Sequence, residues 1–208
     1  MPKLPLPPPV SDLARIPPAW HVVPAGTILY RIYFRGGSYP GVWNQLRYYG
    51  PTSARFDHHE SPPRVQVRGV LYAANHPRTS LAEVFQARRT INARRDEPWL
   101  AGFRPATDIR LLDLTGLWPT RAGASMAINS GLRSTARRWS GAIYQVYPDA
   151  DGLWYGSSMN ANAPCVALYE RAITALPARP SFHRALADDT LRAFLETCAE
   201  LLGYRLVL

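Results

Sequence analysis

Alternating apolar and polar positions predict β-strands in several parts of this 208-residue chain. The segment GTILYRIYF at residues 26–34 is rich in β-branched and aromatic residues and follows the two-residue period of a half-buried strand. The segment CVALY at residues 165–169 is apolar on both faces, which is typical of a central strand. The strands expected from such patterns lie in residues 26–34, 65–74, 108–114, 149–156, 165–169 and 204–208.

A period of about 3.6 residues predicts helices between these strands. The helices are expected to begin near residue 79, within residues 116–131, and across residues 134–146 and 191–202. Residues 92–106 are polar and contain prolines, which favours a loop. Several strands with three or four helices, and neither an internal repeat nor a linker, predict one compact domain of the α/β or α+β class.

The first 24 residues hold eight of the twenty prolines in the chain. Proline fixes φ and lacks an amide donor, so residues 1–24 are expected to form an extended N-terminal arm, with at most one helical turn at residues 13–16. A tether or an arm that lies on the domain is the expected role, although proline-rich segments also bind SH3-like grooves. Residues 25–208 are then expected to form a single domain.

The composition is that of a folded, basic protein. With 47% apolar residues the chain is not a disordered one, and 24 Lys and Arg against 15 Asp and Glu give a net charge of +9. Nearly all of this charge is arginine, which favours anionic partners such as a phosphorylated ligand, a nucleic acid or an acidic protein. The densest basic cluster, Arg133, Arg137 and Arg138, is interpreted as the solvated face of a helix.

Cysteine usage and the N-terminus indicate a cytoplasmic protein. Cys165 and Cys198 are far apart and lack metal-ligand spacing, so we expect two reduced, buried thiols. The N-terminus, broken by prolines, does not resemble a secretory signal, and no apolar run approaches the roughly 20 residues of a membrane-spanning helix. The His58-His59-Glu60 segment is expected to be a solvated loop, and no metal site is assigned.

Glu83 has two possible roles on the residues alone. Ser80 followed three residues later by Glu83 matches a capping box, in which the carboxylate binds its own helix terminus. In a helix, however, Glu83 would lie opposite the apolar stripe of Leu81, Val84 and Phe85, so it would face solvent or a cleft. The chain contains no Walker, Rossmann or nucleophile-elbow motif that would indicate another type of site.

Several short motifs resemble the RES-domain toxins of bacterial toxin–antitoxin pairs. These motifs are YRIY, ARF, GVLYAA followed by TSLAEVF, and DGLWYGSS, and the resemblance runs over about residues 26–175. It implies an α+β fold with mixed sheets and surrounding helices, similar to that of ADP-ribosyltransferase toxins. The family residues carry over to Arg31, Arg55, Tyr72, Glu83 and Ser157. Members often have an arginine two residues after this serine, where this chain has a methionine.

The resemblance also implies an activity that consumes NAD+. Family members cleave the nicotinamide–ribose bond with phosphate or water as the acceptor, or transfer ADP-ribose to a protein. Glu83 would hold a ribose hydroxyl and balance the positive charge that develops, and Arg31 and Arg55 would bind the pyrophosphate. Tyr72 would stack on nicotinamide, and Ser157 would position the ribose or a phosphate.

The implied partner is an antitoxin that carries a helix-turn-helix DNA-binding domain and blocks the NAD+ cleft. The leading hypothesis is therefore a growth-arresting, NAD+-cleaving toxin without a metal cofactor. A mono-ADP-ribosyltransferase toxin with a protein target is the first alternative. A basic nucleic-acid-binding module is the second, which would show a steep loss of affinity with added salt.

Overall fold

A computed structural model of the chain describes residues 4–208, so the prediction of an extended arm for residues 1–3 lies outside the described residues. The strands are β1 (Trp20–Val23), β2 (Leu29–Phe34), β3 (Arg47–Gly50), β4 (Arg64–Ala74), β5 (Thr90–Asn92), β6 (Pro98–Phe103), β7 (Ile109–Asp113), β8 (Gly152–Gly156), β9 (Pro164–Tyr169), β10 (Phe182–Ala185) and β11 (Arg205–Val207). The α-helices are α1 (Val10–Leu13), α2 (Pro77–Phe85), α3 (Trp118–Arg121), α4 (Arg133–Val146) and α5 (Arg192–Leu202). Short 3-10 helices span Met126–Asn129, Glu170–Ala175 and Asp189–Leu191.

Within residues 4–208, nine strands form one mixed sheet. Its order is β1-β7-β8-β9-β4-β2-β6-β10, and β3 pairs with β4 beside this path. Neighbours in this sheet are antiparallel except for the parallel pair β7 and β8, while β5 and β11 form a separate parallel pair. The predicted α+β class with mixed sheets and surrounding helices is therefore confirmed.

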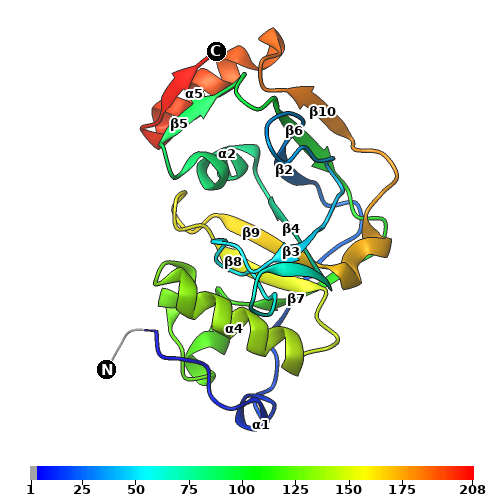
Figure 1. Cartoon of the computed structure of the whole chain (residues 1–208), viewed down its shortest axis with the longest axis vertical. Helices are drawn as coiled ribbons and strands as arrows, with labels where there is room; N and C mark the ends of the chain where they lie inside the picture. The colour runs from blue at the N-terminus through cyan, green and yellow to red at the C-terminus, as the bar shows by residue number, and fades with distance from the viewer. Residues whose placement is uncertain (1–3) are drawn as a thin grey trace.

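Strands β4 and β9 run through the middle of the molecule (Figure 1). The predicted central position of β9 is confirmed, because it pairs with β8 on one side and β4 on the other. Helix α4 covers one apolar cluster, which contains Trp118, Trp139 and Leu153. Helices α2 and α5 share a different cluster, which contains Leu81 and Leu195. The two helix layers thus rest on separate cores that the sheet joins.

The prediction of a loop for residues 92–106 was wrong, because β6 lies there. β6 pairs with β2 along its whole length and with β10 on its other edge. Pro98 stands at the first position of the strand, where a missing amide donor is tolerated. Gly102 leaves room for the Tyr30 ring, which a Cβ atom would approach to 3.1 Å. Neighbouring strands, rather than a local pattern, therefore define β6.

The N-terminal arm lies against the domain. Leu13 is fully buried, the Trp139 indole donates a hydrogen bond to the Pro5 carbonyl at 2.8 Å, and the Tyr147 hydroxyl donates to the Ile16 carbonyl at 2.9 Å. The helical turn expected at residues 13–16 lies slightly earlier, at α1. Residues 20–23, which the proline content had assigned to the arm, form β1 and pair with β7.

Both cysteines are buried free thiols. Cys165 lies in β9 and Cys198 in α5, so each contributes to an apolar cluster. No helix among residues 4–208 has the length and apolar character that crossing a membrane requires.

Candidate active site

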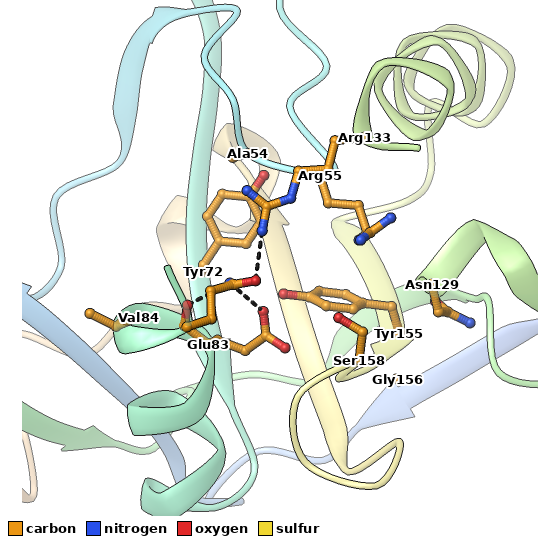
Figure 2. A pocket seen from close by; sticks show the side chains of 11 residues that line it. Ala54, Arg55, Tyr72, Glu83, Val84, Asn129, Arg133, Tyr155, Gly156 and Ser158 are labelled. Carbon is orange, nitrogen blue, oxygen red and sulfur yellow. Dashed lines mark hydrogen bonds between the residues drawn. The ribbon is translucent and has the colours of Figure 1, made fainter. Parts of the chain in front are cut away.

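A cleft with two adjoining lobes opens beside α2: the first lobe lies between α2 and the start of α4, and the second lies between α2 and the sheet. The two lobes share Tyr72, Glu83, Val84 and Tyr155, and their cavity volumes are about 220 and 260 Å³. Figure 2 shows the first lobe, into which the Glu83 side chain points from α2. Because both lobes contain Glu83, a molecule in either one would contact this carboxylate.

The position of Glu83 in α2 excludes the capping-box interpretation, which was wrong. The helix begins at Pro77, and the His76 ring accepts the capping hydrogen bond from the Arg78 amide at 3.1 Å. The Ser80 hydroxyl instead donates to the Tyr30 carbonyl. Glu83 therefore lies in the last turn rather than the first, which leaves its carboxylate available to the cleft.

Ser157 lies directly behind Glu83. Its hydroxyl donates to Glu83 Oε1 at 2.5 Å and accepts from the amides of Met159 and Asn160 at 3.1 Å each. Ser157 is fully buried, whereas its exposed neighbour Ser158 lines the first lobe. The structure therefore places Ser157 where it orients the carboxylate and the following turn.

Arg31 and Arg55 lie in different lobes of the cleft. Arg31 lines the second lobe from β2, and its Nη1 donates to the carbonyls of Trp43 and Gln45 at 2.8 and 2.9 Å. Burial lowers the pKa of Arg31 to about 10, so it stays charged at neutral pH. Arg55 lines the first lobe and donates to the Gly131 carbonyl at 2.5 Å. The two positive charges thus flank the carboxylate from both sides.

Two tyrosines form the wall between the lobes. Tyr72 comes from β4 and Tyr155 from β8, and both line each lobe. Burial raises the pKa of the Tyr72 hydroxyl, and burial together with the nearby Cys165 and Glu83 raises that of Tyr155 well above its ordinary value. Both rings are therefore neutral and present flat, partly apolar surfaces suited to an aromatic ligand.

Several cleft residues were missed by sequence reasoning. Arg133, interpreted from the sequence as part of a solvated face, lines the first lobe and donates to Gln86 Oε1 at 2.6 Å. Asn129 also lines this lobe, and Arg47 lines the second. The densest basic cluster of the chain was a signal for Arg133, but no local pattern placed it beside α2. Met159, which stands where family members often have an arginine, packs against the apolar cluster of α2 and α5.

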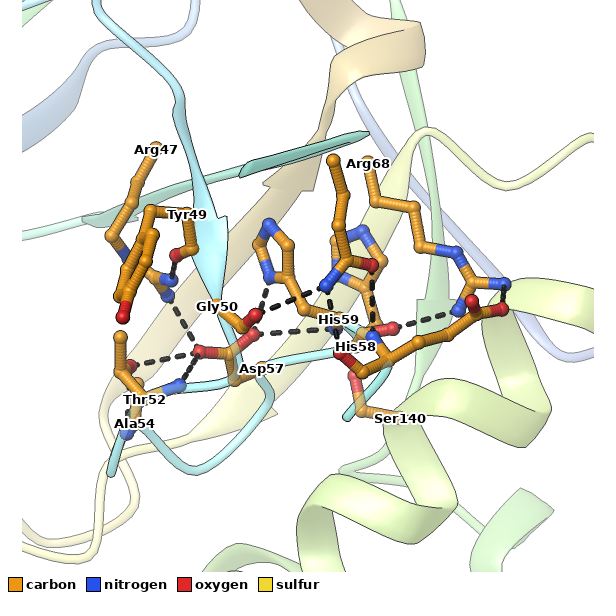
Figure 3. A network of polar contacts seen from close by, with 12 residues as sticks. Arg47, Tyr49, Gly50, Thr52, Ala54, Asp57, His58, His59, Arg68 and Ser140 are labelled. Carbon is orange, nitrogen blue, oxygen red and sulfur yellow. Dashed lines mark hydrogen bonds and ion pairs between the residues drawn. The ribbon is translucent and has the colours of Figure 1, made fainter. Parts of the chain in front are cut away.

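A polar network centred on the buried Asp57 includes Arg47, which lines the second lobe (Figure 3). Asp57 accepts hydrogen bonds from Arg47 at 2.9 Å, from the Thr52 amide at 2.6 Å and from His59 Nδ1 at 2.5 Å. Burial raises the pKa of Asp57, but these hydrogen bonds and the Arg47 charge outweigh it and hold that pKa well below its usual range. The network thus fixes Arg47 at the edge of the cleft.

The prediction of a solvated loop for His58 and His59 was wrong, because both rings are buried. His58 stacks on Tyr144 of α4 with 4.4 Å between ring centroids, and its Nε2 lies 3.8 Å from Glu170. These covering residues are more than 80 positions away in the chain, so no local pattern reveals them. Among residues 4–208, no three His, Cys, Asp or Glu side chains are grouped as a metal site would require.

Comparison with known proteins places this fold among RES proteins. One chain of the crystal structure of the M. tuberculosis MbcT–MbcA toxin–antitoxin complex has a similar fold, with a TM-score of 0.59 over 92% of this chain and 96% of that chain, at 15% identity. This likeness agrees with the expected α+β fold of mixed sheets and surrounding helices. No curated protein matches the sequence. The family model described as "RES domain" matches residues 28–190. Because this match covers well over half of the chain, the protein belongs to the RES domain family.

Proposed function

We propose that this protein is the toxin of a toxin–antitoxin pair and that it cleaves the nicotinamide–ribose bond of NAD+. One observation carries the proposal: the Glu83 carboxylate points into a cleft, is held there by the buried Ser157 hydroxyl, and lies between lobes that contain Arg55 and Arg31. Family membership and the likeness to a chain of a toxin–antitoxin complex support the proposal.

The chemistry needs a fixed negative charge beside the ribose. Breaking the bond to nicotinamide builds up positive charge on the ribose, as in glycoside hydrolysis, and a preorganised carboxylate stabilises that charge. Glu83 would supply this carboxylate and hold a ribose hydroxyl. Nicotinamide leaves as a neutral molecule from a cationic ring, so the cleft needs no general acid.

The arginines and Tyr72 would bind the rest of the substrate. Arg31 uses Nη1 for two backbone carbonyls, which fixes its guanidinium plane and leaves its other nitrogens for the pyrophosphate. Arg55 is fixed in a similar way by the Gly131 carbonyl. Tyr72 would stack on the nicotinamide ring, since it lines both lobes.

The acceptor of ADP-ribose is a separate part of the proposal. Phosphate or water would attack from the open side of the cleft. Transfer to a cellular protein is the alternative, and it is favoured by one observation: Met159 is directed into an apolar cluster, so this position brings no charge that would hold a phosphate.

The proposed partner is an antitoxin with a helix-turn-helix DNA-binding domain, and the proposed site of action is the cytoplasm. The net charge of +9 suits an acidic partner segment that covers the cleft. An antitoxin that covers the lobes containing Arg55 and Arg31 would exclude the substrate from Glu83.

The test is to incubate purified protein with NAD+ and identify the products by mass. ADP-ribose phosphate in phosphate buffer, or ADP-ribose without phosphate, supports cleavage, whereas a labelled band after incubation with labelled NAD+ and cell lysate supports protein transfer. We expect Glu83→Gln to lower NAD+ consumption by about 100-fold or more, because a fixed charge at the reacting centre is lost. The exposed Glu196→Gln on α5 is the matched control. A Glu83→Gln variant that consumes NAD+ at the wild-type rate would refute the assignment.

A further inference from the structure

Gln86 and Arg133 form a hydrogen-bonded bridge across the cleft beside Glu83. Gln86 follows the last turn of α2, and its Nε2 donates to the Glu83 carbonyl at 2.6 Å and to Glu83 Oε2 at 3.3 Å. Its Oε1 accepts from Arg133 Nη2 at 2.6 Å, and Arg133 is the first residue of α4 on the opposite wall (Figure 2). The carboxylate is thereby linked through one amide group to the other side of the cleft.

The chemistry of arginine determines which way this amide faces. A guanidinium group only donates hydrogen bonds, so Arg133 requires the oxygen of the Gln86 amide. The NH2 group of Gln86 must then face Glu83, where it can donate. In the flipped orientation, two oxygens would lie against each other beside Glu83, and two donors would face each other beside Arg133.

We infer that Gln86 and Arg133 are positioning residues for Glu83, an inference that rests on the proposed role of this carboxylate. Ser157 holds Oε1 from behind, while Gln86 holds Oε2 from the side of the cleft. With both oxygens held, the carboxylate keeps one orientation towards the first lobe. Arg133 acts only through Gln86, by selecting the orientation in which that amide donates.

A different role for Arg133 is direct binding of a substrate phosphate, because it lines the same lobe as Arg55. The two roles differ in kinetics. A phosphate-binding arginine contributes to substrate affinity and acts independently of Gln86. A positioning arginine affects the chemical step, and its contribution disappears once Gln86 is removed.

The kinetic test uses Gln86→Leu, Arg133→Ala and the double variant, with Arg138→Ala as the control for loss of an exposed charge from the same helix. We expect each single variant to lower kcat for NAD+ consumption about tenfold with KM within about twofold, and the double variant to match Gln86→Leu. A rise in KM at unchanged kcat for Arg133→Ala, or multiplied effects in the double variant, would overturn the inference.

Gln86→Glu separates positioning from a structural role. This variant keeps the length of the side chain and a partner for Arg133, but it replaces the donor to Glu83 with a second negative charge. We expect kcat to fall at least as far as in Gln86→Leu. Wild-type kcat in Gln86→Glu would mean that the side chain serves only to join the walls, and the inference would fail.

A measurement without substrate tests the bridge even if the protein does not act on NAD+. The side-chain amide signals of Gln86 in a ¹⁵N–¹H spectrum, assigned by their loss in Gln86→Leu, should shift in Arg133→Ala and stay unchanged in Arg138→Ala. Unshifted signals in Arg133→Ala would overturn the bridge. Absence of NAD+ turnover in the wild-type protein would instead refute the proposed function.

Discussion

Replacing Ser157 with alanine should lower both the stability of the fold and the rate of NAD+ turnover. The hydroxyl is fully buried and makes three hydrogen bonds: it donates to Glu83 Oε1 and accepts from two backbone amides of the following turn. Alanine removes all three bonds and leaves the side-chain space almost unchanged. The loss is therefore one of polar partners rather than of apolar contact.

The size of the effect follows from these bonds. A hydrogen bond to a charged group contributes about 1.5–3 kcal/mol, and amides that lose an acceptor add to this cost. We expect Ser157→Ala to lower the free energy of unfolding by about 2–4 kcal/mol. For a protein of this length, each kcal/mol corresponds to roughly 2–4 °C, so Tm should fall by about 4–16 °C.

The assay is a thermal melt followed by circular dichroism, combined with NAD+ turnover at a temperature where the variant is folded. We expect kcat to fall at least tenfold, because Glu83 loses the group that orients it. Ser158→Ala is the control for the melt, since Ser158 is exposed. If Ser157→Ala melted within about 1 °C of the wild type, the reasoning from the buried hydroxyl would be refuted.

Two further variants test the sheet and the buried network. In Gly152→Ala, a Cβ atom would collide with the Ala167 backbone carbonyl, so we expect the free energy of unfolding to fall by about 4 kcal/mol or more in a denaturant titration. The control is Gly141→Ala, which should be neutral or stabilising, because the new Cβ would meet no atom within 4 Å apart from the backbone of its own helix. Burial raises the pKa of Glu170, but the nearby His58 ring and hydrogen bonds from the Gly69 amide and the Tyr144 hydroxyl hold it at about 2, against an ordinary 4.5. A carboxylate with a depressed pKa stabilises the fold at pH values above its ordinary pKa. The free energy of unfolding of the wild type should therefore exceed that of Glu170→Gln by up to about 3 kcal/mol at pH 7, and the difference should vanish as pH falls from 4.5 to 2. A difference that did not change with pH would contradict this.

The sequence predicted elements that carry a strong local period. Strand β4 and helices α4 and α5 were expected close to their observed bounds, and the expected end of the last helix at residue 202 is confirmed, because Gly203 follows it in the left-handed conformation. Strands β1, β3, β5, β6 and β10 were not predicted. They are short or begin with proline, and they exist because a neighbouring strand supplies hydrogen-bond partners. Such tertiary stabilisation leaves no period in the sequence.

The candidate site was predictable in part. The resemblance identified Arg31, Arg55, Tyr72 and Glu83 as site residues, and these four side chains line one cleft in the structure. The resemblance could not reveal that Ser157 lies behind Glu83, because this contact depends on how the end of β8 packs against α2. The bridge across the cleft was equally hidden, since its two residues are 47 positions apart.

The apolar cores of this protein extend beyond the segment that the family model matches. The family model spans residues 28–190, yet Leu13 fills the core beneath α4 and α5 fills the core beneath α2. A fragment cut at residues 28 and 190 would expose both of these surfaces to water, on the two sides of the cleft. The family model therefore contains the cleft residues, whereas both apolar cores include side chains from the flanking segments as well.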